Sequence, residues 1–72
     1  MKFSDIKKGM ELTNEIEVVT VLSEPRFSFV FDCMLVEVTS HSNGQFDTIL
    51  EKEIKFYQKA YCDNWEIYKK ID

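Results

Sequence analysis

The sequence predicts one small, mostly β domain over residues 1–72, and three observations support this fold class. Apolar and polar residues alternate over 10–23 and again over 27–38, which is the period of a half-buried strand. The dipeptide Asn43-Gly44 is a strong hairpin signal, because both residues tolerate a positive φ. Hydrophobic residues make up 44% of the chain and aromatic residues 14%, which is typical of a folded domain with a core.

The first alternating segment, residues 10–23, is predicted to form one half-buried strand or two strands with a kink near Asn14. Its apolar face consists of Met10, Leu12, Ile16, Val18 and Leu22. Its polar face consists of Glu11, Thr13, Glu15 and Glu17. Val19 and Val21 add apolar groups to the polar face, so the far end of the segment is expected to be covered on both sides.

A second strand is predicted to follow a turn at 23–26, where Pro25 presets its own φ. One face of this strand carries Phe27, Phe29, Phe31, Cys33 and Leu35. The alternation inverts from Val36, which predicts a β-bulge near 34–36 that bends the strand around one core. Burial of a phenylalanine contributes about 1.5–3 kcal/mol, so the three phenylalanines are expected to form that core.

The second half of the chain is predicted to begin with a hairpin at 40–45 and a third strand in "QFDTIL", residues 45–50. Residues 48–60 fit a short helix with a capping box formed by Thr48 and Glu51, but they also fit a strand, a tight turn and another strand. A closing strand is predicted at 64–71, with Trp65, Ile67 and Ile71 pointing inward.

These elements together resemble an SH3-like small β-barrel. The resemblance is carried by "IKKGMEL" at 6–12, the "SNGQ" hairpin at 42–45, "TILEKEIKFY" at 48–57 and "WEIYK" at 65–69. It implies a partly open barrel of about five strands and a binding or adaptor role. The short helix predicted within 48–60 is longer than the 3₁₀ turn typical of these barrels. The alternative fold is a three- or four-stranded antiparallel sheet with one helix packed across it.

The charge balance argues against two classes of partner. Thirteen acidic and nine basic residues give a net charge of −4, whereas nucleic acids and anionic membranes attract basic surfaces. The start of the chain has no apolar segment typical of a signal peptide, and no apolar run is long enough to span a membrane. A cytoplasmic location is therefore expected.

No catalytic, cofactor or metal site is predicted. His41 lies between two serines beside the hairpin turn and is interpreted as an exposed turn residue. Cys33 and Cys62 are far apart in sequence and lack the paired spacing of a zinc site, so both are interpreted as small buried hydrophobic residues.

The sequence favours a non-enzymatic protein-interaction module. The predicted partner-binding residues are the acidic Glu11, Glu15, Glu17 and Glu37 and the aromatic Phe56 and Tyr68. Such a small acidic protein could be a phage or mobile-element accessory protein that inhibits a host nucleic-acid-binding enzyme, and self-pairing at a strand edge could make a homodimer. The alternative is a nucleic-acid-associated barrel that uses Lys52, Lys55, Lys59, Lys69 and Lys70.

Overall fold

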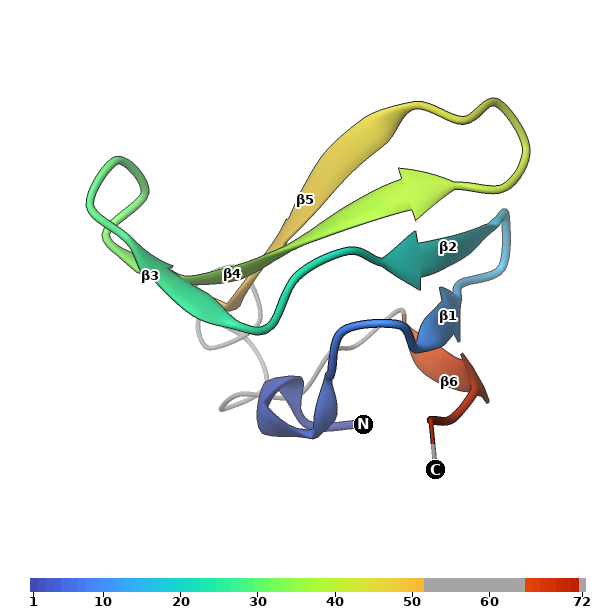
Figure 1. Cartoon of the computed structure of the whole chain (residues 1–72), viewed down its shortest axis with the longest axis horizontal. Helices are drawn as coiled ribbons and strands as arrows, with labels where there is room; N and C mark the ends of the chain where they lie inside the picture. The colour runs from blue at the N-terminus through green and yellow to red at the C-terminus, as the bar shows by residue number, and fades with distance from the viewer. Residues whose placement is uncertain (52–64, 72) are drawn as a thin grey trace.

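The computed structural model describes residues 1–51 and 65–71, and this part of the chain is mostly β (Figure 1). One 3₁₀ turn precedes six strands. These are η1 (Phe3–Asp5), β1 (Glu11–Thr13), β2 (Val18–Val21), β3 (Arg26–Ser28), β4 (Cys33–Ser40), β5 (Phe46–Leu50) and β6 (Glu66–Lys69). The predicted fold class is therefore confirmed at the level of a small, mostly β protein.

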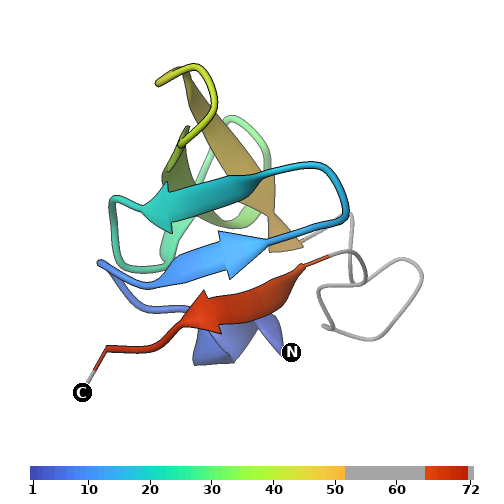
Figure 2. The same cartoon turned by 90° about the vertical axis from the view of Figure 1, so that its right-hand side faces the viewer.

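The six strands form one antiparallel sheet that is not closed into a barrel. Its order is β3-β4-β2-β1-β6, and β5 also pairs with β4. Figure 2 shows β2, β1 and β6 side by side in one layer, with β5 crossing steeply behind them. This crossing bends the sheet around a core, which is how a small sheet covers its apolar face without a second sheet.

The first alternating segment forms two strands, which is the second of the two predicted alternatives. Thr13 pairs with Val18 across a hairpin whose turn is built around Asn14. The side-chain Oδ1 of Asn14 accepts hydrogen bonds from the backbone N–H groups of Ile16 and Glu17, at 2.8 and 2.7 Å. A short amide that bonds to backbone two and three residues later is a turn-forming contact, and this explains why the strand ends here.

The predicted hairpin at 40–45 is also present, with residues 41–43 in the turn between β4 and β5. The N–H of Gly44 donates to the carbonyl oxygen of Ser40 at 2.8 Å, and the N–H of Ser40 donates to that of Gln45 at 2.9 Å. Gly44 has a φ of +68°, a conformation that glycine adopts without steric cost. Asn43 has no positive φ, so the connection differs from the two-residue turn that an Asn-Gly pair most often makes.

The core lies on the concave side of the sheet and includes the start of the chain. Phe3 and Ile6, in and after η1, are 2% and 1% exposed. They pack with residues of four strands or their flanks: Met10, Leu12, Val19, Val21, Val36, Val38 and Ile49. The N–H of Lys2 donates to Oδ2 of Asp5 at 3.1 Å, which holds η1 in the turn that presents Phe3. The alternation of the strands did not predict this N-terminal contribution.

The predicted phenylalanine core is wrong. Phe27 is 48% exposed, Phe29 93% and Phe31 39%. The stretch that contains them is a hairpin instead of one long strand, because residues 29–32 form the turn between β3 and β4. Phe29 and Phe31 therefore lie beyond the end of the β3–β4 ladder, while Phe27 pairs with Met34 within it and is still 48% exposed.

The predicted bulge near 34–36 is absent as well. β4 pairs one to one with β5 from Leu35 to Thr39, with no extra residue on either strand. Leu35 and Val36 are both buried although they face opposite sides of β4, at 3% and 0% exposure. The inverted alternation thus reflects a strand covered on both faces at this point, which periodicity alone does not distinguish from a bulge.

The closing strand is present as β6, which pairs with β1. Trp65 and Ile67 pack against the core as predicted, whereas Ile71 is 48% exposed. Residues 48–50 belong to β5, and residues 52–60 of the predicted helix lie outside the described residues.

Candidate interaction surface

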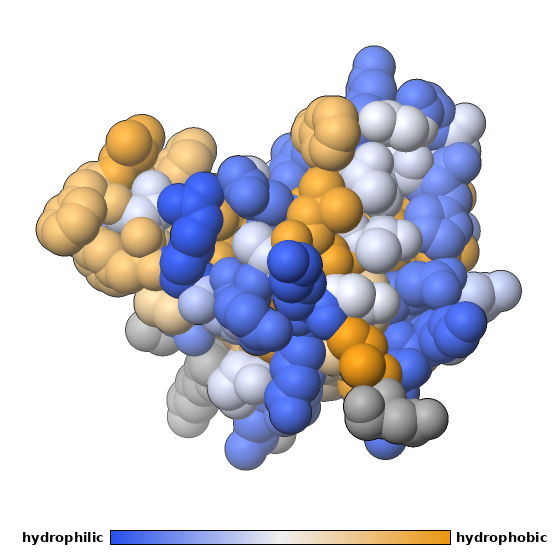
Figure 3. All heavy atoms as spheres, in the orientation of Figure 1, coloured by the Kyte–Doolittle hydropathy of each residue, from blue (hydrophilic) through white to orange (hydrophobic). Residues whose placement is uncertain are grey.

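The turn between β3 and β4 carries a projecting group of apolar side chains, which we call the apolar tip. Its members are Phe27, Phe29, Val30 and Phe31. Phe29 and Val30 are 93% and 87% exposed, so nearly all of their surface meets water. Figure 3 shows a hydrophobic projection on the left of the molecule, where Figure 1 places this turn. A contiguous exposed apolar group of this kind is typical of an interaction site, whereas single exposed residues are normal.

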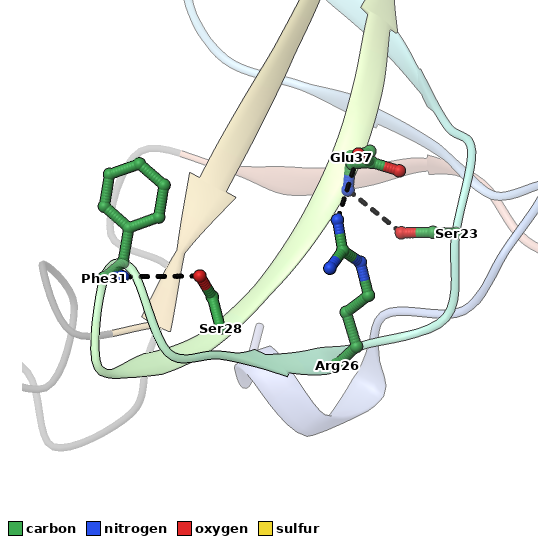
Figure 4. Close-up of polar contacts among 5 residues, drawn as sticks. All are labelled: Ser23, Arg26, Ser28, Phe31 and Glu37. Atoms are coloured by element: carbon green, nitrogen blue, oxygen red, sulfur yellow. Dashed lines mark hydrogen bonds and ion pairs between the residues drawn. The ribbon is translucent and has the colours of Figure 1, made fainter.

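The shape of the turn is set by short polar side chains on either side of the apolar residues. The Oγ of Ser28 accepts a hydrogen bond from the backbone N–H of Phe31 at 3.3 Å (Figure 4). Asp32 has a φ of +56° and is the only non-glycine residue of the described chain with a positive φ. Aspartate tolerates this conformation better than most residues, so a sequence without glycine still makes the turn.

Two of the tip rings also hold each other. The rings of Phe27 and Phe29 meet edge to face, with centroids 5.2 Å apart and planes at 79°. Such a pair contributes about 0.5–1.5 kcal/mol beyond area burial and limits the freedom of both rings. The tip is thus partly ordered before any partner binds, which lowers the entropic cost of binding.

The base of the tip is held to β4 by polar contacts that Figure 4 shows. The guanidinium Nη2 of Arg26 lies 3.1 Å from Oε1 of Glu37. The backbone N–H of Glu37 donates to the Oγ of Ser23, also at 3.1 Å. Both charged side chains are about half exposed, at 55% and 49%, so the pair positions the hairpin more than it stabilises it.

The predicted acidic residues do not line one strand face. Glu11 lies on β1, while Glu15 lies in the β1–β2 turn because the strand ends at Thr13. Glu17 accepts a hydrogen bond from the Oγ of Ser40 through Oε2 at 3.0 Å. The expectation of a shared strip on one strand is therefore wrong in its geometry.

The predicted aromatic residues lie away from the apolar tip where they can be placed. Tyr68, on β6, is 63% exposed, and β6 and β3 are at opposite ends of the strand order. Phe56 and Cys62 lie outside the described residues.

The residues that bring exposed apolar surface together are instead Phe29 and Val30, which sequence reasoning missed. Val30 was the available signal, since it breaks the alternation and makes three consecutive apolar residues.

His41 is an exposed turn residue, as interpreted from the sequence, and its ring also contacts the sheet. Its Nε2 lies 2.6 Å from the Oγ1 of Thr20 and 3.9 Å from Oε1 of Glu11. A catalytic triad needs the carboxylate and the hydroxyl on different ring nitrogens, so that one orients the imidazole while the other exchanges a proton. Here both groups face the same nitrogen, and this arrangement fits a contact that anchors the turn to β1 and β2.

The remaining groups that could carry chemistry are few in the part of the chain that the structure describes. Cys33 is 7% exposed and is a free thiol, which matches its interpretation as a small buried hydrophobic residue. Across residues 1–51 and 65–71, no three His, Cys, Asp or Glu side chains lie close enough to hold a metal ion.

A hollow with lysines at its border lies where η1 and the end of β6 meet. Its lining consists of Ser4, Asp5, Lys7, Met10, Ile67, Lys70 and Ile71. We call it the lysine hollow. Gly9 allows the chain to pass closely under Ile71, because a Cβ at Gly9 would lie 2.8 Å from Cδ1 of Ile71. The hollow therefore brings apolar side chains together with Lys7, near the start of the described chain, and Lys70, near its end.

Comparison of the chain with protein-family models, with curated proteins and with solved structures finds no match. Within the described ranges, no helix has the length and apolar character needed to cross a membrane. The surface described above is therefore the basis on which a function can be argued.

Proposed function

We propose that this chain is a non-enzymatic protein-interaction module that inserts its apolar tip into a pocket on a partner protein. The observation that carries the proposal is the exposure of Phe29 and Val30, side by side, at the end of a projecting hairpin. Folding gains little from Phe29 and Val30, because nearly all of their side-chain surface stays in water. Burial in a partner would contribute about 1.5–3 kcal/mol for each large apolar side chain, which is the scale of an interface hot spot.

A narrower form of this proposal is an accessory protein of a phage or mobile element that inhibits a host nucleic-acid-binding enzyme. The net charge of −4 supports repulsion of nucleic acid from the bound partner. In this form, Glu11, Glu15, Glu17 and Glu37 act as dispersed charges around the molecule. The anchoring contact remains the apolar tip.

The test is a comparison of two variants that each remove exposed apolar surface. Phe29→Ser combined with Val30→Ser changes the apolar tip. Ile16→Ser changes an isolated residue that is 91% exposed in the turn between β1 and β2. Tagged wild-type protein is used to capture partners from cells of the source organism, and affinity for each purified partner is then measured by calorimetry.

The tip variant is expected to bind the partner at least about tenfold more weakly, because hot-spot truncations cost more than 1.4 kcal/mol. The Ile16→Ser control is expected to keep the affinity within about twofold, as is usual for residues outside an interface. Equal affinity of the tip variant and the wild type would show that the partner binds elsewhere.

A second candidate function is association with nucleic acid through lysines. It is supported by Lys7 and Lys70, which border the same hollow, and by Lys69, which is exposed nearby on β6. Lys52, Lys55 and Lys59 lie outside the described residues. Fluorescence anisotropy with a labelled single-stranded oligonucleotide tests it, because phosphate contacts make affinity fall steeply with salt. Binding that is weak at low salt and unchanged by Lys69→Gln with Lys70→Gln would exclude this candidate.

A further inference from the structure

We infer that the apolar tip of one molecule binds the lysine hollow of a second copy of this chain, so that the protein self-associates through two different surfaces. The inference uses the same tip as the proposed function but is tested separately from it. The two surfaces lie on different sides of the molecule, because Figure 1 places the β3–β4 turn at its upper left and β6 at its lower right. A molecule therefore cannot cover its own tip with its own hollow.

The apolar components of the two surfaces match in kind. The tip offers Phe29 and Val30, which are 93% and 87% exposed. The hollow offers the side chains of Ile67, which is half-buried, and Ile71, which is 48% exposed, whereas Met10 lines it as a residue of the core. Contact between them would remove apolar surface from water on both molecules, which is the main favourable term in protein association.

The charged components match in sign. Asp32 is the charged residue of the tip, directly after the apolar side chains, and it is exposed. A carboxylate covered by a partner without a compensating charge or hydrogen bond is costly, so a surface that receives the tip has to supply a cation or a donor. Lys7 and Lys70 border the hollow and are exposed, and they supply that cation. Asp5 also lines the hollow, where its Oδ2 accepts the hydrogen bond from the N–H of Lys2.

The same charge argument disfavours other occupants. Anionic headgroups repel a protein with a net charge of −4, so an anionic bilayer is a poor receptor for the tip. Contact between two tips would bring two Asp32 carboxylates together. Among the described residues, Arg26 is the cation at the base of the tip, and it already faces Glu37 at 3.1 Å.

A contact between two different surfaces can be tested by complementation, because each surface can be removed while the other is kept. The tip variant is Phe29→Ser with Val30→Ser. The hollow variant is Lys7→Glu with Lys70→Glu. The four residues are exposed, so both variants are expected to fold, and circular dichroism with thermal unfolding checks this. Ile16→Ser is the matched control for loss of exposed apolar surface.

Analytical ultracentrifugation over a range of concentrations measures the mass of each sample. We expect the wild type and the Ile16→Ser control to gain mass with concentration, and each surface variant alone to remain monomeric. A mixture of the two variants is expected to form one-to-one dimers, since one supplies an intact tip and the other an intact hollow. One hairpin turn offers a small contact surface, so we expect weak association that is visible at high protein concentration.

A charge exchange separates the specific contact from the general repulsion of acidic molecules. Asp32→Lys is expected to abolish self-association of the wild type and to restore it in the hollow variant, where glutamates have replaced both lysines. Wild-type protein that stays monomeric at its highest soluble concentration would overturn the inference and leave the proposed function unaffected. The inference would also be overturned if the surface variants associated as the wild type does. It would be overturned as well if the wild type stayed monomeric yet sedimented with phosphatidylcholine vesicles through its tip.

Discussion

The two hairpins that share β4 close with opposite kinds of turn. The β4–β5 connection consists of the polar residues "SHSNGQ", and Gly44 supplies the positive φ that the turn needs. The β3–β4 connection consists of "FVFD", in which Asp32 supplies the positive φ and apolar side chains point into water. Folding accounts for the first turn completely. It does not account for the apolar residues of the second, and their cost in solubility indicates a role outside the fold.

The largest expected effect separates the core from the apolar tip. Leu12→Ala is expected to lower the free energy of unfolding by about 2–5 kcal/mol, because Leu12 is 0% exposed and its loss leaves a cavity. A single core in a domain of this size supplies about 3–5 kcal/mol, so this variant should be largely unfolded at room temperature. Phe29→Ala should change the free energy of unfolding by no more than about 0.5 kcal/mol. Urea denaturation followed by circular dichroism measures both.

A smaller effect is expected from substituting the residue with a positive φ in each of the two turns, Gly44 and Asp32. Gly44→Ala should lower the free energy of unfolding by about 1 kcal/mol through backbone strain alone, since no atom lies within 4 Å of the added Cβ. Asp32→Gly should raise it by a few tenths up to about 1 kcal/mol, because the strained conformation is relieved. Thermal unfolding of both variants measures these changes. A loss of stability in Asp32→Gly would mean that the Asp32 carboxylate has a structural partner.

The edge-to-face contact between Phe27 and Phe29 should be visible as a coupling within the apolar tip. A double-mutant cycle with Phe27→Ala and Phe29→Ala is expected to give a coupling energy of about 0.5 kcal/mol, at the low end of aromatic pairs because both rings are exposed. Chemical denaturation of the four proteins provides the values. Strict additivity would show that the rings move independently in solution.

The smallest effect is expected at the base of the apolar tip. Glu37→Gln removes the ion pair with Arg26 and should cost about 0.2–1 kcal/mol at low ionic strength. The cost should shrink in 1 M salt, where exposed charges are screened beyond about 3 Å. A salt-independent loss of stability would instead assign the effect to packing of the Glu37 side chain.

The candidate site was only partly predictable, because residues 29–32 were expected within a strand but form a turn. Alternating phenylalanines predict a strand face, and hydrophobic residues in a short chain predict a core. The turn at 29–32 has neither glycine nor proline, the two residues that most often indicate a turn. As a result the three phenylalanines expected at the centre of the protein are exposed, and the core is completed by Phe3 and Ile6 from a segment without strand periodicity.

The residues by themselves determined the mostly β class, the break at Asn14, the turn at Asn43-Gly44 and the closing strand that holds Ile67. These features depend on local chemistry: alternation with a period of two, and short side chains or glycine that favour turns. Only the tertiary structure decided which apolar residues are buried, because burial depends on what lies opposite each face. Phe29 and Leu12 are both hydrophobic residues in alternating segments, but Leu12 lies within β1 and is 0% exposed, whereas Phe29 follows the end of β3 and is 93% exposed.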